Sequence, residues 1–270
     1  MESSEKKYKI IDMHCHIYPD RIARKASDST SRFYDMPSLY DGKISTLLEY
    51  GTRAGIEHFV VQSVATTPKQ VSSINRFIAQ AVKDGDGRFT GLGTLHPDSE
   101  DIEADFTEIL ELGLKGVKLH PDIQRFRIDE DKMMKIYELC EGCLPILMHT
   151  GDHRFDYSNP NRMAPVLKTF KKLTVIGAHF GGWSVWDEAE KQLAGYDNLY
   201  VDCSSSLYAM SHEKAEELIR TYGADKVLFG TDYPMWDIDT ELERFMKLDL
   251  TEKERESIFS LNAQKLFGIQ

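Results

Sequence analysis

Short apolar runs rich in β-branched residues alternate with amphipathic segments along most of the chain. The runs have the lengths of buried strands, and the segments between them carry apolar residues at helical spacing. Eight runs occur, at residues 9–15, 59–64, 89–95, 116–120, 145–149, 173–179, 199–203 and 226–232. Strands that alternate with helices are typical of a parallel sheet. Eight such units in 270 residues predict an α/β fold, the (β/α)₈ TIM barrel.

A doubly wound open sheet is the alternative arrangement of the same elements. It normally carries a glycine-rich phosphate-binding turn after the first strand, and the sequence has none there. No linker or shift of composition divides the chain, so we expect residues 1–270 to form one domain. The polar stretch 18–41 shows little periodicity and is predicted as a long loop, of the kind that often binds ligands.

Composition narrows the range of partners. The formal net charge of −11 argues against nucleic acid and anionic membranes, which leaves a small-molecule substrate and keeps self-association into a homo-oligomer open. Residues 1–7 lack the apolar segment of a secretory signal, and no apolar run approaches the ~20 residues of a membrane span. Four cysteines in a chain of this length do not suggest a disulfide framework, so we expect a cytoplasmic protein.

Histidines, acids and one lysine gather at the carboxyl ends of the predicted strands. These strand-end residues are His14, His16, Lys118, His120, His149, His179, Asp202 and Asp232. Because alternate side chains of a strand share a face, Asp12, His14 and His16 are expected to point the same way. Catalytic groups of a (β/α)₈ barrel lie at this end. Several imidazoles with a carboxylate suit zinc or a similar divalent ion, and we assign His14, His16, His149 and Asp232 as its ligands.

Five ordered motifs resemble the amidohydrolase superfamily, and most closely its "amidohydrolase 2" branch. They are Asp12-x-His14-x-His16 and residues 116–121 (GVKLHP), 147–151 (LMHTG), 177–182 (GAHFGG) and 228–234 (LFGTDYP). That branch includes aminocarboxymuconate-semialdehyde decarboxylase, resorcylate-type decarboxylases, and hydrolases of lactones or amides. The resemblance covers nearly the whole chain and implies a TIM barrel with one divalent metal. It places the ligands at the same four residues and makes His179 a catalytic histidine.

Two features of the sequence bear on which reaction is catalysed. Lys118 lies on the fourth strand, where binuclear members of the superfamily carry a carboxylated lysine that bridges two metals. The branch that the chain resembles is usually mononuclear, so we expect one ion, with Lys118 paired to Asp232 or to an anionic substrate. Decarboxylases of the branch hold the substrate carboxylate with arginines. None aligns here, and the loop candidates are Arg125, Arg127, Arg154 and Arg162.

The leading functional expectation is hydrolysis of a small amide, ester or lactone. A divalent ion lowers the pKa of water, Asp232 would take the water's proton, and His179 would stabilise the developing oxyanion. One alternative is a non-oxidative decarboxylase of a small unsaturated or aromatic carboxylate that uses the same metal site. Another is a metal-binding barrel without catalysis. The residues expected to bind substrate or support the ligands are Asp12, Lys118, His120, Arg154, Trp183 and Tyr233.

Overall fold

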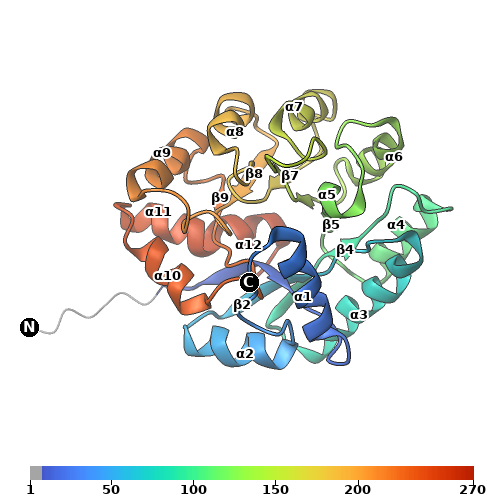
Figure 1. Ribbon diagram of the computed structural model, residues 1–270, viewed down its shortest axis with the longest axis horizontal. Helices are drawn as coiled ribbons and strands as arrows, with labels where there is room; N and C mark the ends of the chain where they lie inside the picture. Colours follow the sequence, from blue (N-terminus) through green and yellow to red (C-terminus); the bar gives the residue numbers. More distant parts are fainter. Residues whose placement is uncertain (1–7) are drawn as a thin grey trace, which may run out of the picture.

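A computed structural model describes residues 8–270 and shows the predicted barrel, with strands inside a ring of helices (Figure 1). The strands are β1 (Ile11–His16), β2 (His58–Gln62), β3 (Phe89–Gly91), β4 (Gly93–Thr94), β5 (Val117–Leu119), β6 (Ile146–Met148), β7 (Val175–Gly177), β8 (Leu199–Asp202) and β9 (Val227–Leu228). Neighbouring strands run β1-β2-β3 and β4 to β9, and every pair is parallel. Only Leu92 separates β3 from β4, so the two segments occupy the third of eight strand positions.

Hydrogen bonds between the first strand and the end of the last one close the barrel. The Met13 amide donates to the Phe229 carbonyl at 2.9 Å, and the His16 amide donates to the Tyr233 carbonyl at 2.7 Å. The buried Asp12 carboxylate strengthens this seam, because it accepts hydrogen bonds from the amide and the hydroxyl of Thr231. The (β/α)₈ barrel predicted from the alternation of elements is therefore confirmed.

The helices lie between the strands, as the amphipathic segments predict. They are α1 (Ala23–Tyr34), α2 (Ile44–Arg53), α3 (Val71–Asp84), α4 (Ile102–Glu111), α5 (Pro121–Gln124), α6 (Asp131–Cys140), α7 (Pro160–Thr169), α8 (Trp186–Leu193), α9 (His212–Tyr222), α10 (Ile238–Met246), α11 (Glu252–Glu256) and α12 (Asn262–Phe267). A 3₁₀ turn, η1 (Pro68–Gln70), precedes α3, and a π-helical turn, η2 (Ser257–Leu261), joins α11 to α12.

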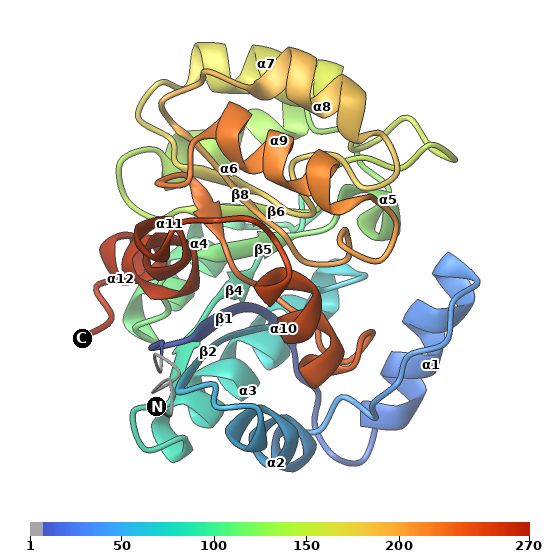
Figure 2. The same ribbon diagram turned by 90° about the vertical axis from the view of Figure 1, so that its left-hand side faces the viewer.

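The prediction of a long loop at 18–41 was wrong, because this stretch contains α1. The helix buries only Ala23 and Ser27, so it lacks the broad apolar stripe by which a helix is recognised in a sequence. Asp35 caps the C-terminal end of the helix in a left-handed conformation with φ of 54°. Figure 2 shows α1 projecting from the body of the molecule on the side away from the C-terminus.

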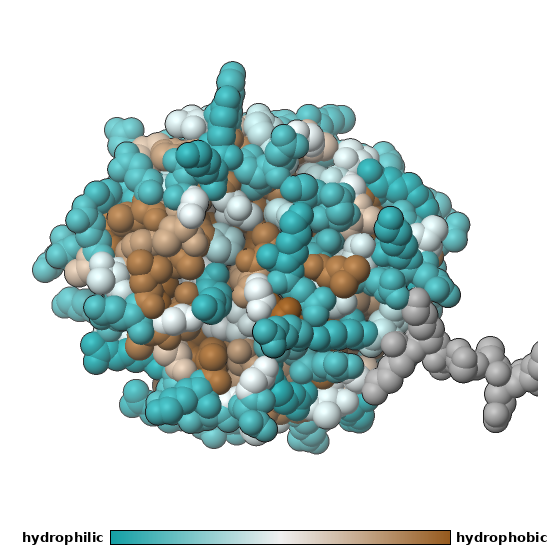
Figure 3. Space-filling view, turned by 180° about the vertical axis from the view of Figure 1, so that it is seen from behind, coloured by the Kyte–Doolittle hydropathy of each residue, from teal (hydrophilic) through white to brown (hydrophobic). Residues whose placement is uncertain are grey.

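Two apolar clusters fix which end of the barrel is open. The larger one lies between strands and outer helices, whereas the smaller one fills the barrel with residues such as Val60, Leu147 and Ile176. Ala263 and Phe267 of α12 belong to the inner cluster, so this helix covers the amino end of the strands. Figure 3 shows the molecule from behind, where apolar patches are separated by hydrophilic side chains. The opposite, carboxyl end of the strands is thus the end that can admit a ligand.

An irregularity in β1 changes the expected register of its polar residues. The pairing with β2 shifts between Asp12 and Cys15. Met13 consequently belongs to the inner cluster, while Cys15 belongs to the outer one. Simple alternation would place both on the same side. The expectation that Asp12 shares one face with His14 and His16 was therefore wrong, and Asp12 contacts the barrel seam instead.

Several compositional expectations can be compared with the structure. None of the helices between residues 8 and 270 combines the length and the apolarity needed to cross a membrane. All four cysteines carry free thiols. The expectation about a secretory signal concerns residues 1–7, which lie outside the described residues.

Candidate active site

Three of the predicted metal ligands meet at the carboxyl end of the barrel. The Nε2 atoms of His14 and His16 lie 3.3 Å apart. Asp232 Oδ1 lies 3.5 Å from His14 Nε2 and 3.7 Å from His16 Nε2. Asp232 follows β9 in a left-handed conformation with φ of 59°, which aspartate tolerates better than most residues. The closed seam between β1 and β9 thus brings together residues that are more than 200 positions apart in the chain.

The three donor atoms fit a single divalent ion. A triangle with sides of 3.3, 3.5 and 3.7 Å has a circumscribed circle of radius about 2.0 Å, so one point lies at a normal metal–ligand distance from all three atoms. Burial lowers the pKa of His14 and of His16 well below the ordinary value, which keeps both imidazoles neutral. Two neutral imidazoles and one carboxylate are a donor set that divalent transition metals prefer.

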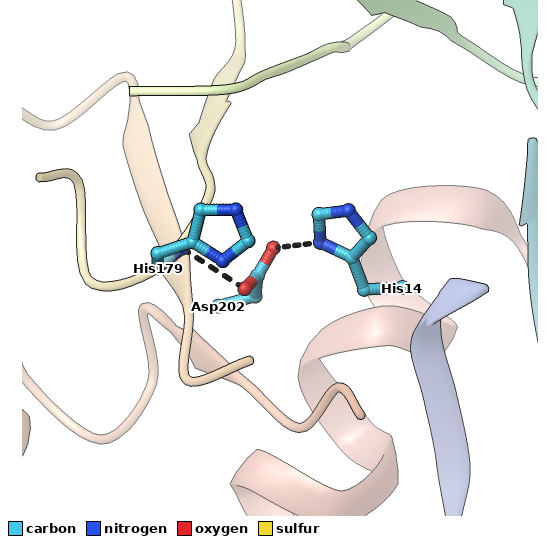
Figure 4. Close-up of side chains that lie close together, drawn as sticks. All are labelled: His14, His179 and Asp202. Atoms are coloured by element: carbon cyan, nitrogen blue, oxygen red, sulfur yellow. Dashed lines mark hydrogen bonds and ion pairs between the residues drawn. The ribbon is translucent and has the colours of Figure 1, made fainter. Parts of the chain in front are cut away.

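Asp202 orients the first of these ligands. Its Oδ2 atom accepts a hydrogen bond from His14 Nδ1 at 2.9 Å, while its Oδ1 atom accepts one from the His179 amide at 3.1 Å (Figure 4). A carboxylate only accepts, so the His14 proton lies on Nδ1 and the Nε2 lone pair faces His16 and Asp232. Sequence reasoning placed Asp202 at a strand end without a role. The orienting contact exists because only β9 separates β8 from β1 in the closed barrel.

The fourth predicted ligand, His149, lies elsewhere in the pocket. Its Nδ1 atom lies 3.2 Å from His179 Nε2, and its Nε2 atom lies 3.6 Å from Asp122 Oδ2. The structure therefore groups His149 with His120 and Asp122, separately from the group of His14, His16 and Asp232. The two groups face one pocket, because His149, His179 and Asp232 all line it.

A hydrogen bond to the main chain fixes the tautomer of His179. Its Nδ1 atom lies 2.9 Å from the Ser204 carbonyl oxygen, which can only accept. The His179 proton is therefore on Nδ1, and the lone pair of Nε2 faces His149. Burial lowers the pKa of His179 to about 3, and the nearby carboxylate of Asp202 only partly offsets this.

Lys118 is fully buried beside His14, His16 and Asp232, which we call the ligand group. Its Nζ atom lies 3.1 Å from His14 Nε2, closer to the ring than to the carboxylate with which we expected it to pair. Burial lowers the pKa of Lys118 to about 8, against the opposing charges of Asp202 and Asp232. An ammonium next to a divalent ion is repelled, so metal binding favours the neutral amine at this position.

Aromatic side chains and methionines dominate the walls of the pocket. The pocket is open to solvent and is lined by Tyr34, Met36, His149, His179, Trp183, Ser205, Asp232, Met235 and Trp236. Tyr34, on α1, does not stand out in the sequence, because the residues around it show little helical periodicity. Trp183 lines the pocket as one of the candidate residues, whereas Tyr233 points away, with its hydroxyl donating to the Lys43 carbonyl at 2.7 Å.

Ser205 and Trp236 hold the second oxygen of Asp232. The indole of Trp236 donates to Ser205 Oγ at 2.7 Å, and the Ser205 hydroxyl donates to Asp232 Oδ2 at 2.5 Å. Because an indole N–H only donates, the direction of this chain is fixed. Burial raises the pKa of Asp232 to about 7, while the hydrogen bond from Ser205 lowers it. Oδ1 is left to face the two histidines.

Arg154 anchors α1 at the rim of the pocket. Its guanidinium donates to both oxygens of the buried Asp152, and its Nη1 donates to the Phe33 carbonyl at 2.8 Å. The same group lies 5.2 Å from the ring centre of Tyr34 and 5.4 Å from that of Trp183. Arg154 is thus committed to structural contacts.

Arg162, another of the four arginines considered for binding a substrate carboxylate, makes ion pairs with Asp129 and Asp156. Arg125 and Arg127 are absent from the lining of the pocket as the described residues form it.

Comparison with known proteins shows the family. The family model described as amidohydrolase matches residues 11–269, so the chain belongs to this family. A sequence search of curated proteins returned no match. The resemblance of the five motifs is therefore confirmed at the level of the family.

Solved structures share the fold over nearly the full chain. An uncharacterised TIM-barrel protein from Bordetella bronchiseptica is 24% identical with a TM-score of 0.82, covering 96% of this chain and 98% of that one. A 5-carboxyvanillate decarboxylase from Sphingomonas paucimobilis is 15% identical with a TM-score of 0.72, covering 97% and 99%. A dihydroxybenzoic acid decarboxylase from a Polaromonas species, solved with bound manganese, is 16% identical with a TM-score of 0.72, covering 97% of each chain.

Proposed function

We propose that the protein is a metal-dependent decarboxylase of a small, planar aromatic or unsaturated carboxylate. The observation that carries this proposal is the pocket itself, in which Asp232, a member of the ligand group, lies among the rings of Tyr34, Trp183 and Trp236. Such walls suit a flat conjugated substrate. Structurally similar proteins that decarboxylate carboxyvanillate and dihydroxybenzoate support the choice.

A bound divalent ion would supply the positive charge that polarises a substrate oxygen. The protein's own residues supply the proton and its placement. Loss of carbon dioxide leaves an electron pair on carbon, which must take up one proton. Asp232 is the group placed to deliver this proton, because it lines the pocket beside the two histidines of β1. Ser205 holds Oδ2 of Asp232, so the orientation of its carboxyl group is set before substrate arrives.

Hydrolysis of a small ester, lactone or amide is the second candidate. The observation in its favour is that no arginine or lysine lines the pocket formed by the described residues, while Arg154 and Arg162 are engaged in ion pairs. A neutral carbonyl substrate needs no cationic partner. Asp232 would then take a proton from the attacking water and return it to the leaving group.

One experiment separates the two reactions. Purified protein loaded with manganese or zinc would be incubated with carboxyl-¹³C aromatic and unsaturated carboxylates, and in parallel with lactones and esters in ¹⁸O water. We expect release of labelled carbon dioxide, and its loss in Asp232→Asn with melting temperature and metal content retained. Incorporation of ¹⁸O into products, with no carbon dioxide from any carboxylate, would establish hydrolysis instead. Absence of both reactions in the metal-loaded protein would favour a binding role.

A further inference from the structure

Tyr34 reaches the pocket from an unexpected direction. It is the last residue of α1, and its ring meets Trp183 edge to face with ring centres 5.0 Å apart. Its hydroxyl lies 2.7 Å from His120 Nε2 and 3.4 Å from His149 Nε2, on the β5–β6 side of the barrel mouth. Asp232 and the two histidines of β1 lie on the side where β1 meets β9.

The hydrogen bonds of His120 determine the direction of its contact with Tyr34. His120 caps α5, and its Nδ1 atom accepts a hydrogen bond from the Ile123 amide at 3.3 Å. An atom that accepts from an N–H carries no proton, so the His120 proton lies on Nε2. Nε2 therefore donates to the oxygen of Tyr34. The proton of the Tyr34 hydroxyl is left for another acceptor.

Within the described residues, His149 Nε2 is the other polar atom found close to this hydroxyl. The 3.4 Å separation is long for a bond from a hydroxyl. The Tyr34 proton is thus poorly satisfied by the protein and free to turn into the pocket.

The other donors on the pocket wall are already used. The Ser205 hydroxyl donates to Asp232, the Trp236 indole donates to Ser205, and the Trp183 side chain hydrogen-bonds to Tyr208. A ligand with an oxygen acceptor on the β5–β6 side would meet the hydroxyl of Tyr34. Its position is well defined, because Arg154 ties the end of α1 to Asp152.

We infer that Tyr34 is a substrate-positioning residue, whose hydroxyl proton binds a carboxylate or carbonyl oxygen on the end of the substrate remote from the His14–His16–Asp232 group. The inference rests on the proposed function only in placing the substrate's reacting end at that group. The protein would accordingly favour planar substrates with two oxygen-bearing groups, one at each end of the pocket. A neutral hydroxyl can donate to a carbonyl oxygen or to a carboxylate oxygen.

Calorimetric binding of simple aromatic acids tests this without requiring turnover. Benzoate offers one acceptor group, and isophthalate and terephthalate offer two. We expect the metal-loaded wild type to bind one of the dicarboxylates about tenfold more tightly than benzoate, since a hydrogen bond to a charged group contributes on this scale. Tyr34→Phe keeps the ring and should abolish this ratio, while benzoate affinity, metal content and melting temperature stay unchanged. Tyr50→Phe, on α2 and outside the pocket lining, is the matched control and should keep the ratio.

Two results would overturn the inference. One is an equal dicarboxylate-to-benzoate ratio in wild type and Tyr34→Phe, and the other is no preference for either dicarboxylate in the wild type. Replacing one carboxylate by an aldehyde, as in 4-carboxybenzaldehyde, separates carboxylate from carbonyl recognition. Failure to release carbon dioxide would refute the proposed reaction and leave this binding result standing. Loss of the Tyr34 effect in an active decarboxylase would refute the inference alone.

Discussion

The replacement of Asp202 by asparagine should weaken metal binding through a change of tautomer at His14. In the wild type, Oδ2 of Asp202 accepts from His14 Nδ1, and Oδ1 accepts from the amides of His179 and Ser204 and from the Ser204 hydroxyl. Asparagine can keep three of these bonds by placing its oxygen at Oδ1. Its amide group then faces His14 and can only donate.

The alternative orientation of the asparagine is less favourable. In that orientation the asparagine oxygen keeps the bond to His14, but the amide group faces the three donors that bond to Oδ1 in the wild type. This loses two more hydrogen bonds than the first orientation does, or about 2 kcal/mol. His14 Nδ1 must therefore become an acceptor in Asp202→Asn, and its proton moves to Nε2. That atom faces His16 and Asp232 and would have to lose the proton again to bind an ion.

The expected cost is about 10- to 100-fold in metal affinity, or about 1.4–2.7 kcal/mol, the range found when partners of metal-binding histidines are removed. Competition with a chelator of known affinity measures the dissociation constant, and elemental analysis after dialysis measures stoichiometry. Asp197→Asn makes the same change of charge at an exposed position and should bind metal as the wild type does. If Asp202→Asn also binds within twofold of the wild type, the assignment of the His14 tautomer is wrong.

Three further substitutions test neighbouring contacts. Ser205→Ala frees Oδ2 of Asp232 and should lower kcat about tenfold with metal content retained, and an unchanged kcat would show that this bond is not needed for turnover. In Asp12→Asn, the side-chain amide group replaces one of the two oxygens that accept from Thr231 at the barrel seam, so one donor of Thr231 loses its acceptor. Denaturant titration should show that the free energy of unfolding falls by about 2–4 kcal/mol. A loss below about 0.5 kcal/mol would contradict that view of the seam. Arg154→Lys cannot keep the forked contact, so amide exchange in α1 should accelerate about tenfold, and unaltered exchange would show that α1 is held by other contacts.

The sequence by itself determined the fold and the end of the barrel at which to look for a site. Eight apolar runs separated by amphipathic segments leave few arrangements other than a (β/α)₈ barrel, because strand and helix periodicities are local properties. His14, His16 and Asp232 were identified in the same way, since the carboxyl ends of parallel strands must converge. The motifs around them pointed to the amidohydrolase family, which the match over residues 11–269 confirms.

Contacts between distant elements were decided only by the tertiary structure. Because the pairing of β1 with β2 is irregular, Asp12 lies at the barrel seam and does not share a face with His14 and His16. Such a shift of pairing cannot be recognised from the pattern of hydrophobic residues. The side on which His149 lies depends on its rotamer and on Asp122. Tyr34 came to the pocket on a helix whose surface is almost entirely polar, and which is held by Arg154 from another loop. Strand ends follow from periodicity along the chain, whereas the partners of each polar side chain follow from packing between elements far apart in sequence.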